Sequence, residues 1–342
     1  MSTAPAPPAA TAAAVRGDEL AERARSGDRR ALARLLTEIE NRTAAGEAAL
    51  RRLYPRAGAA HLIGVTGAPG AGKSTLVAAL TGLARRSARA VAVIAIDPSS
   101  PITGGALLGD RVRMQEHAGD REVFIRSMAS RGHSGGLAPA TVGAAAALDA
   151  VGFPLVFIET VGTGQSEVEV AAIADTTLVV QAPEMGDEVQ AIKAGLLEVA
   201  DLVVVNKGDR PGAQRAAAQL RAMLTVGRQQ DLAAQAAGRA RPKRPDVLLA
   251  TASDGSGVPE LLAALDRRWA ERAARQSSSI DGARLSRARL QVLGILAERV
   301  EARLEAAALR PLTDELVAAV AAHQLDPFAA ADALLEALEA RP

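Results

Sequence analysis

Short runs of apolar, often β-branched residues recur along the middle of the chain, and longer segments with helical periodicity separate them. Runs that are apolar at every position are typical of strands covered on both faces, and alternation of strands with helices is typical of a parallel sheet. We therefore predict a doubly wound, mainly parallel α/β sheet. Its predicted strands are residues 62–65, 91–96, 123–125, 155–158, 177–180, 202–205 and 247–249.

Helical periodicity also marks both ends of the chain. Near the N-terminus, Leu32, Leu35, Leu36 and Ile39 form one apolar stripe, and "SGD" at 26–28 offers an N-cap in front of it. After about residue 281 the apolar spacing is helical again. We expect a disordered tail at 1–14, a helical arm at 15–58, an α/β domain at 59–275 and a helical region at 276–342.

Composition excludes several classes of partner and site. A net charge of +1 gives no electrostatic reason to expect nucleic acid or an anionic membrane, and 2% aromatic residues argue against base-stacking surfaces. No apolar run is long enough to span a membrane, and the N-terminus lacks the pattern of a secretory signal. The absence of cysteine excludes disulfides and thiolate metal sites. We expect a cytoplasmic protein that binds neither nucleic acid nor membrane.

The first predicted strand runs into "GAPGAGKST" at 67–75, which has the G-x-x-x-x-G-K-S spacing of a phosphate-binding loop, or P-loop. Glycines let backbone N–H groups converge on phosphate oxygens, and the N-terminus of the following helix adds positive partial charge. Lys73 is expected to neutralise the β- and γ-phosphates, and the Ser74 hydroxyl to coordinate Mg²⁺. A Gly-rich turn that matches by chance is the alternative. The predicted phosphate contacts are Gly67, Ala68, Pro69, Gly70, Ala71, Gly72, Lys73, Ser74 and Thr75.

Three carboxylates are candidates for the same metal ion. Asp97 and Glu159 each follow an apolar run, so both should emerge at the phosphate edge of the sheet. Asp110 lies in a Gly-containing segment that is expected to order around the γ-phosphate and the metal. Mg²⁺ keeps several waters, so one or two carboxylates near Ser74 suffice. An acid at a strand end is also a common helix cap, which is the competing interpretation.

The segment that follows Glu159 bears on hydrolysis. Glu159-Thr-Val-Gly162 stands where many GTP-switching proteins have Asp-x-x-Gly, so the Gly162 amide is a candidate contact for the γ-phosphate. Gln165 is a candidate for orienting the attacking water, and a purely structural amide is equally compatible.

A predicted buried strand ends abruptly in Asn206-Lys207-Gly208-Asp209, which has the form N-K-x-D. A carboxylate accepts two hydrogen bonds side by side, and guanine offers its N1–H and exocyclic amino group in that arrangement, whereas adenine presents a bare N1 acceptor. Asp209 is therefore predicted to select guanine. Asn206 is suited to bridge the base and the P-loop, and the Lys207 stem to lie over the ring.

The last predicted strand ends in Thr251-Ala252-Ser253, from which backbone N–H groups can reach the O6 atom of guanine. An ordinary turn is the alternative, because Ser, Thr and Gly commonly follow strands. The order of the four elements makes a guanine-nucleotide site the favoured interpretation.

With these motifs, the sequence resembles the MeaB/ArgK/MMAA family, the G-protein chaperones of adenosylcobalamin-dependent methylmalonyl-CoA mutase. The resemblance extends over nearly the whole chain, and Glu159 in its motif is one of its particular marks. The residues that carry it are "ARSGDRRALARLLTEIENR" (24–42), "GAPGAGKST" (67–75), "AIDPSSPITGGALLGDRVRM" (95–114), "IETVGTGQSEVEVA" (158–171), "PEMGDEVQAIKAGLLEVADLVVVNKGDRPGA" (183–213) and "LDPFAAADALL" (325–335).

The resemblance implies a P-loop GTPase domain that hydrolyses GTP to GDP slowly, with Mg²⁺, and couples hydrolysis to loading or guarding the B12 cofactor of an acyl-CoA mutase. It implies homodimers formed through the C-terminal helical region at 276–342. It also implies that residues 186–193 act as a further switch loop that brings Lys193 to the catalytic site. A plain helix start capped by Asp187 fits the same residues.

Two other functions remain open. One is a GTP-dependent scaffold or metallochaperone for another metalloenzyme, although the His and Cys cluster that such a protein would want is absent. The other is a transport-associated nucleotide kinase, against which N-K-x-D argues. The client mutase is not specified, because methylmalonyl-CoA, isobutyryl-CoA, 2-hydroxyisobutyryl-CoA and ethylmalonyl-CoA mutases are all compatible.

Overall fold

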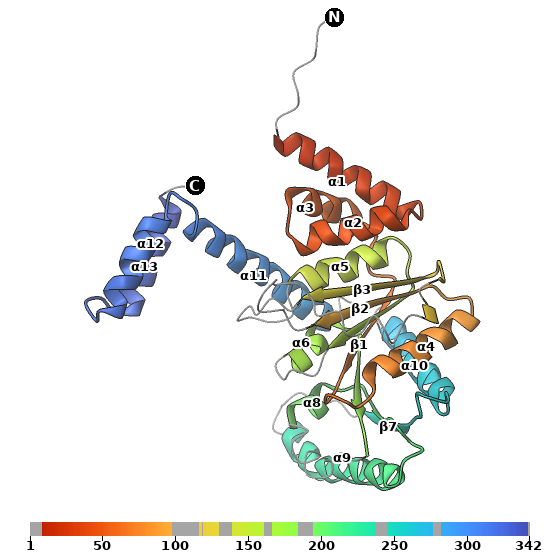
Figure 1. Ribbon diagram of the computed structural model, residues 1–342. Helices are drawn as coiled ribbons and strands as arrows, with labels where there is room; N and C mark the ends of the chain where they lie inside the picture. Colours follow the sequence, from red (N-terminus) through yellow and green to blue (C-terminus); the bar gives the residue numbers. More distant parts are fainter. Residues whose placement is uncertain are drawn as a thin grey trace, which may run out of the picture. The chain divides into compact units, whose positions relative to one another are not determined.

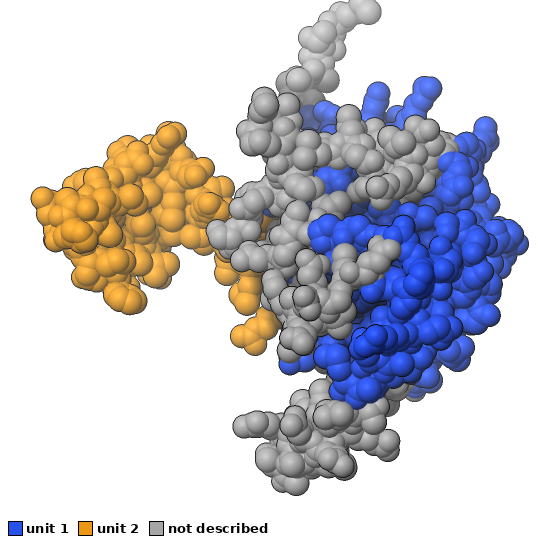
Figure 2. Space-filling model, turned by 60° about the horizontal axis from the view of Figure 1, so that its bottom comes forward, with its two compact units in different colours: residues 1–281 blue, residues 282–342 orange. Residues whose placement is uncertain are grey.

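A computed structural model of the chain describes residues 9–97, 116–117, 119–129, 139–160, 166–183, 194–236, 245–275 and 282–340. The chain divides into two compact units, residues 1–281 and 282–342, which Figure 2 colours separately. Among the described residues, the helices all lack the combination of length and apolar character that crossing a membrane requires.

The first unit is built on a seven-stranded sheet in the order β3-β2-β4-β1-β5-β6-β7, and each neighbouring pair is parallel. All seven strands predicted from the sequence are confirmed, and the prediction of a doubly wound parallel sheet with it (Figure 1). The strands are β1 (His61–Thr66), β2 (Val91–Asp97), β3 (Val123–Ala129), β4 (Leu155–Thr160), β5 (Thr176–Gln181), β6 (Leu202–Val205) and β7 (Asp246–Leu249).

Helices cover both faces of the sheet, which explains why the strands are apolar on successive positions. On one face, Ile63 and Val65 of β1 pack with Leu76 of α4 and Leu261 of α10. On the other face, Val203 packs in a cluster with residues of α9. The helices of the sheet domain are α4 (Lys73–Arg86), α5 (Pro139–Ala150), α6 (Ser166–Ile173), α8 (Ala194–Val199), α9 (Ala213–Ala236) and α10 (Val258–Arg275).

Three helices form the N-terminal arm: α1 (Ala9–Arg25), α2 (Arg29–Glu40) and α3 (Ala44–Leu53), followed by the short 3₁₀ helix η1 (Tyr54–Arg56). α1 begins within the predicted tail, so residues 9–14 are helical; they are Ala-rich, and Ala is the strongest helix former.

The predicted N-cap of α2 is confirmed. The Asp28 carboxylate accepts hydrogen bonds from the backbone N–H groups of Arg30 and Ala31. The Ala31 backbone N–H, with the Arg23 side chain, holds the pKa of Asp28 below its ordinary value. The cap fixes where α2 begins, and thereby which residues face the core.

The apolar stripe of α2 is buried against the sheet domain. Leu35 and Leu36 are fully buried in one cluster with Ile94 of β2 and Ile158 of β4. α5 lies between the arm and the sheet, and Gly143 is where it comes close to the arm, because a Cβ there would stand 3.1 Å from Ile39 Cγ2. The arm and the sheet domain therefore share one hydrophobic core.

The second unit consists of α11 (Gly282–Leu304), α12 (Arg310–Ala321) and α13 (Pro327–Glu339). α13 begins at Pro327 with Asp326 as its N-cap, which accepts from the backbone N–H groups of Phe328 and Ala329. Several large apolar side chains of this unit are exposed, among them Val292 and Phe328.

Candidate functional site

Loops at the carboxyl ends of five parallel strands bring the predicted site residues to one edge of the sheet. The P-loop follows β1, Asp97 ends β2, and Glu159 lies near the end of β4. Asn206 follows β6, and Thr251 comes two residues after β7. This edge is where open α/β sheets bind their ligands.

The P-loop requires glycine at two positions for different reasons. Gly67 has φ +136°, and a Cβ there would collide with the Val180 carbonyl at the end of β5. Gly72 has φ +88° and forms the N-cap of α4, and a Cβ there would collide with Asn206 Nδ2. The second glycine therefore makes room for a residue of the predicted base-binding motif.

Lys73 is buried and held over the loop it belongs to. Its Nζ donates hydrogen bonds to the carbonyls of Gly67 at 2.7 Å and Ala68 at 3.1 Å. A lysine ammonium is a compact positive charge with three N–H donors. Its place inside the loop fits the predicted contact with phosphate oxygens.

Two predicted metal ligands contact each other directly. Ser74 Oγ, in the first turn of α4, donates to Glu159 Oε1 at 2.5 Å, and both residues are buried. Asp97 is also buried. Glu159 pairs with Ala95 across the ladder, and Asp97 lies two residues further along β2, so the two carboxylates leave the sheet on the same face.

This donor set suits Mg²⁺, which prefers oxygen ligands and keeps several waters. Within the described ranges no group of three His, Cys, Asp or Glu side chains that could hold a metal occurs. Among the described residues, Ser74, Glu159 and Asp97 are the side chains whose oxygens suit such an ion, together with phosphate oxygens and water.

Asn206 joins the P-loop to the last loop of the predicted site. Its Nδ2 donates to the carbonyls of Ala71 at 2.9 Å and Gly72 at 3.4 Å, and its Oδ1 accepts from the Ala252 backbone N–H at 3.0 Å. The side chain is buried, so these bonds are shielded from water. The structure thus contains the predicted contact of Asn206 with the P-loop. The hydrogen bond to Ala252 is an additional contact that the sequence did not predict.

The turn after Asn206 is held in a special conformation. Lys207 has φ +57°, in the left-handed region, and the Gly208 backbone N–H donates to the Ala250 carbonyl at 3.0 Å. Thr251 is buried, whereas Asp209 and Ser253 are exposed. The turn therefore presents the Asp209 carboxylate to solvent beside the loop at 251–253.

A cavity of about 660 Å³ lies against α4 and the loop at 252–255. Three predicted nucleotide contacts line it, Thr75, Ala252 and Ser253. Motif-based reasoning missed its other polar walls, Arg86, Glu116, His117 and Asp254. The sequence does contain a pattern that could have identified Arg86. It lies eleven residues after Thr75, which is about three helical turns, so both side chains lie on the same face of α4.

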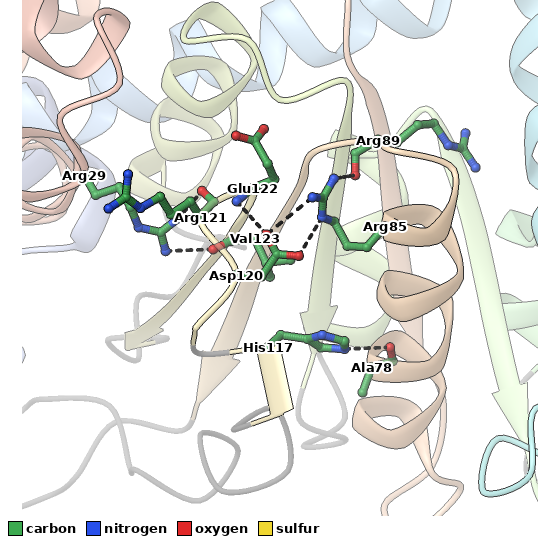
Figure 3. A network of polar contacts seen from close by, with 9 residues as sticks. All are labelled: Arg29, Ala78, Arg85, Arg89, His117, Asp120, Arg121, Glu122 and Val123. Atoms are coloured by element: carbon green, nitrogen blue, oxygen red, sulfur yellow. Dashed lines mark hydrogen bonds and ion pairs between the residues drawn. The ribbon is translucent and has the colours of Figure 1, made fainter.

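His117 fixes one wall of this cavity. Its Nε2 lies 3.1 Å from the Ala78 carbonyl of α4, so Nε2 is the nitrogen that carries the hydrogen. Asp120 accepts from Arg85 Nε at 2.8 Å and from the Glu122 backbone N–H (Figure 3). The segment that leads into β3 is thus attached to the helix that follows the P-loop.

Four predicted catalytic or metal-binding residues lie outside the described residues: Asp110, Gly162, Gln165 and Lys193. Their roles remain predictions.

The chain is similar to several known GTPases. The family model described as "Methylmalonyl Co-A mutase-associated GTPase MeaB" matches residues 32–309. The chain is 43% identical over 328 residues to a protein of Pyrococcus horikoshii named as a GTPase, covering 95% of this chain and 99% of the relative. It is 45% identical over 195 residues to GTPase ArgK of Escherichia coli, covering 56% of this chain and 59% of that protein.

A more distant relative is the methylmalonic aciduria type A homolog of Mus musculus, 37% identical over 202 residues, or 58% of this chain and 46% of that protein. Among solved structures, one titled "Crystal structure of LAO/AO transport system kinase" aligns with a TM-score of 0.65 and 27% identity, covering 95% of this chain and 98% of that one. The family model covers well over half of the chain, and the chain belongs to the MeaB family of GTPases.

Proposed function

We propose that the protein is a GTP-hydrolysing chaperone that binds a cobalamin-dependent acyl-CoA mutase of the methylmalonyl-CoA mutase type and gates loading or protection of its B12 cofactor. The family description, a mutase-associated GTPase, supports this partner class. The name of the mouse relative points to the same metabolism. A cytoplasmic location remains a prediction.

The observation that carries the nucleotide part of the proposal is the double link made by Asn206. One side chain ties the loop predicted to hold phosphates to the loop predicted to meet the guanine base. Both ends of one nucleotide would therefore bind to a pre-positioned pair of loops, which reduces the ordering cost of binding.

Each side chain at the sheet edge has a proposed task. The P-loop N–H groups and Lys73 bind the phosphates, and Asp209 accepts from the guanine N1–H and amino group. Mg²⁺, held by Ser74 with Glu159 and Asp97, supplies charge neutralisation at the phosphates when bound. The site is thereby selective for guanine, because adenine would leave the Asp209 carboxylate unpaired.

The hydrolytic step itself rests on residues outside the described ranges. Gly162 is proposed to contact the γ-phosphate, Gln165 to orient the attacking water, and Lys193 to approach the site with residues 186–193. Asp110 is proposed as a further metal contact. A mutase that altered the placement of these residues would alter the hydrolysis rate.

We also propose that the chain forms a homodimer through its C-terminal helices. Leu285, Val292 and Leu296 are exposed on α11 at spacings of seven and four residues, which place them on one face of the helix. A helix with an exposed apolar face of this kind gains stability by burying that face against a partner.

The partner class is tested by affinity purification from the native host with the chain loaded either with a non-hydrolysable GTP analogue or with GDP. The proposal predicts recovery of an acyl-CoA mutase, in different amounts in the two nucleotide states. Purified mutase and chain should then form a complex in size-exclusion chromatography. No complex with any cobalamin-dependent mutase of that host would contradict the proposal.

A further inference from the structure

The two ends of α2 contact the beginning and the second half of β3, one of the two edge strands of the sheet. At the first end, Arg29 donates through its guanidinium to the carbonyls of Arg121 and Val123 (Figure 3). The same guanidinium lies over the ring of Phe124, 5.4 Å from the ring centroid. These contacts fix the point at which the chain enters β3.

At the other end of α2, the Glu40 carboxylate contacts the last part of β3. Its Oε2 accepts from Arg126 Nη2, and its Oε1 accepts from the Ala129 backbone N–H at 3.4 Å. An edge strand has backbone N–H groups without a neighbouring strand to accept them. Glu40 therefore provides the acceptor at the carboxyl end of this strand.

The Arg126–Glu40 pair is largely withdrawn from water. The side chains of Arg126 and Glu40 are 19% and 13% exposed. Arg126 lies between Phe124 and Met128 on the same face of β3, and both of these belong to the core shared with the arm. The Arg126 Nε is buried and has no hydrogen-bond partner within the described ranges. Displacing Glu40 would leave the charge of Arg126 buried and uncompensated, so the two side chains are held firmly in their positions.

Ala129 connects this contact to the proposed metal site. It pairs in register with Asp97 at the end of β2, and Ala95 of β2 pairs with Glu159. The arm is therefore connected to the two carboxylates by the contact of Glu40 with Ala129 and by the pairing of β2 with its neighbours β3 and β4. The end of β2 is held on one side by β4 and on the other by the strand that Glu40 fixes.

We propose that Glu40 is a positioning residue for the Mg²⁺-dependent step of GTP hydrolysis, acting through the end of β3 on the placement of Asp97. The inference rests on the proposed assignment of Asp97 to the Mg²⁺ site. It makes the N-terminal arm part of the catalytic unit, and a protein that binds the arm would act on the metal site through the same contacts.

The test is the Mg²⁺ concentration that gives half-maximal GTP hydrolysis at saturating GTP, measured on the full chain. Glu40→Gln keeps the size of the side chain and an acceptor, but removes the charge that holds Arg126. It should raise this concentration about threefold to tenfold, the range typical of residues that act through a coupled network. GDP affinity measured without Mg²⁺ should stay unchanged.

Glu38→Gln is a matched control. Glu38 lies on the same helix, its side chain is 15% exposed, and it accepts from Arg16 and from Thr43 Oγ1, both within the arm. The control should lower the melting temperature by a similar amount and leave the Mg²⁺ requirement at its wild-type value. Equal Mg²⁺ requirements in the two variants would overturn the proposal.

A double variant, Glu40→Gln with Arg126→Met, separates positioning from the cost of an unpaired charge. It leaves no buried charge in the pair, so the fold should be retained, and the Mg²⁺ requirement should stay raised. A return to the wild-type requirement would overturn the proposal, because the effect would then come from the unpaired Arg126.

Asp97→Asn distinguishes failure of the inference from failure of the site. A raised Mg²⁺ requirement in Asp97→Asn with none in Glu40→Gln would overturn only the role of Glu40. An unchanged requirement in Asp97→Asn would overturn the metal assignment and, with it, the inference. Neither result depends on which mutase the chain binds.

Discussion

Ser74 Oγ donates a 2.5 Å hydrogen bond to Glu159 Oε1, which joins the first turn of α4 to the end of β4 across 85 residues of sequence. The contact brings a hydroxyl and a carboxylate, each predicted separately to bind Mg²⁺, to the same point at the sheet edge. It also orients both groups before any nucleotide arrives, because each is buried.

Ser74→Ala should therefore raise the Mg²⁺ concentration needed for GTP hydrolysis by about tenfold or more, since it removes both a ligand and the hydrogen bond that orients Glu159. Titration of hydrolysis rate with Mg²⁺ measures the effect. Ser87→Ala, at the other end of α4, is a suitable control. A wild-type Mg²⁺ requirement in Ser74→Ala would place the metal elsewhere.

Lys73→Ala should abolish GTP hydrolysis and leave the fold intact. The ammonium donates to the carbonyls of Gly67 and Ala68 in its own loop, so its loss removes positive charge from the phosphate site and leaves the apolar core unchanged. Hydrolysis assays and far-ultraviolet circular dichroism measure the two quantities. Loss of the dichroism signal would indicate a structural lysine instead.

Gly72→Ala should weaken guanine-nucleotide binding more than Gly70→Ala does. Both glycines have positive φ, +88° and +77°, so alanine is strained at either position. Only at Gly72 does the added methyl group meet Asn206 Nδ2, whereas at Gly70 it meets nothing within 4 Å. The difference in GDP affinity between the variants isolates the displacement of Asn206, and equal affinities would show that Asn206 contributes nothing to binding.

Stability should fall with acidification through a buried histidine far from this edge. Burial lowers the pKa of His61 to about 4, and its ring stacks on Trp269 at 4.9 Å and contacts Thr176 Oγ1 at 2.8 Å. The unfolded chain binds a proton on this residue below its ordinary pKa of 6.5, whereas the folded chain does so only below about 4. This contribution to the free energy of unfolding is therefore complete above pH 6.5 and is lost progressively down to pH 4, by about 3 kcal/mol in all.

The measurement is urea unfolding between pH 4.5 and 7, followed by the fluorescence of Trp269, the only tryptophan of the chain. His61→Phe keeps an aromatic ring against Trp269 and removes the titrating group, so its stability should depend less on pH over this range. The same pH dependence in both proteins would assign the acid sensitivity to other groups.

The sequence was sufficient to predict features that depend on neighbours along the chain. Apolar runs identify all seven strands, and the segment 26–28 is identified as the N-cap of α2, which the structure assigns to Asp28. The predicted end of β3 is Ile125, because the polar side chain of Arg126 interrupts the apolar run. In the structure the strand continues to Ala129. The partner that makes this arginine acceptable in a strand, Glu40, lies 86 residues earlier.

The same limit explains what was missed at the site. Motifs placed Asn206 beside the P-loop, but its acceptance from the Ala252 N–H depends on how β7 aligns with β6. The collision that excludes a side chain at Gly72 likewise arises between distant segments. The arm was predicted as a separate element, whereas Leu35 and Leu36 share a core with the sheet, which helical periodicity alone does not reveal.

The proposed selection of guanine by Asp209 is measured directly by kcat/KM for GTP, ATP and XTP with the wild-type chain and Asp209→Asn. We expect the wild type to hydrolyse GTP far better than ATP or XTP. Asp209→Asn should prefer XTP, because an amide can donate to the carbonyl at position 2 of xanthine, whereas a carboxylate cannot. Equal hydrolysis of ATP and GTP by the wild type, or unchanged guanine preference in Asp209→Asn, would contradict the claim.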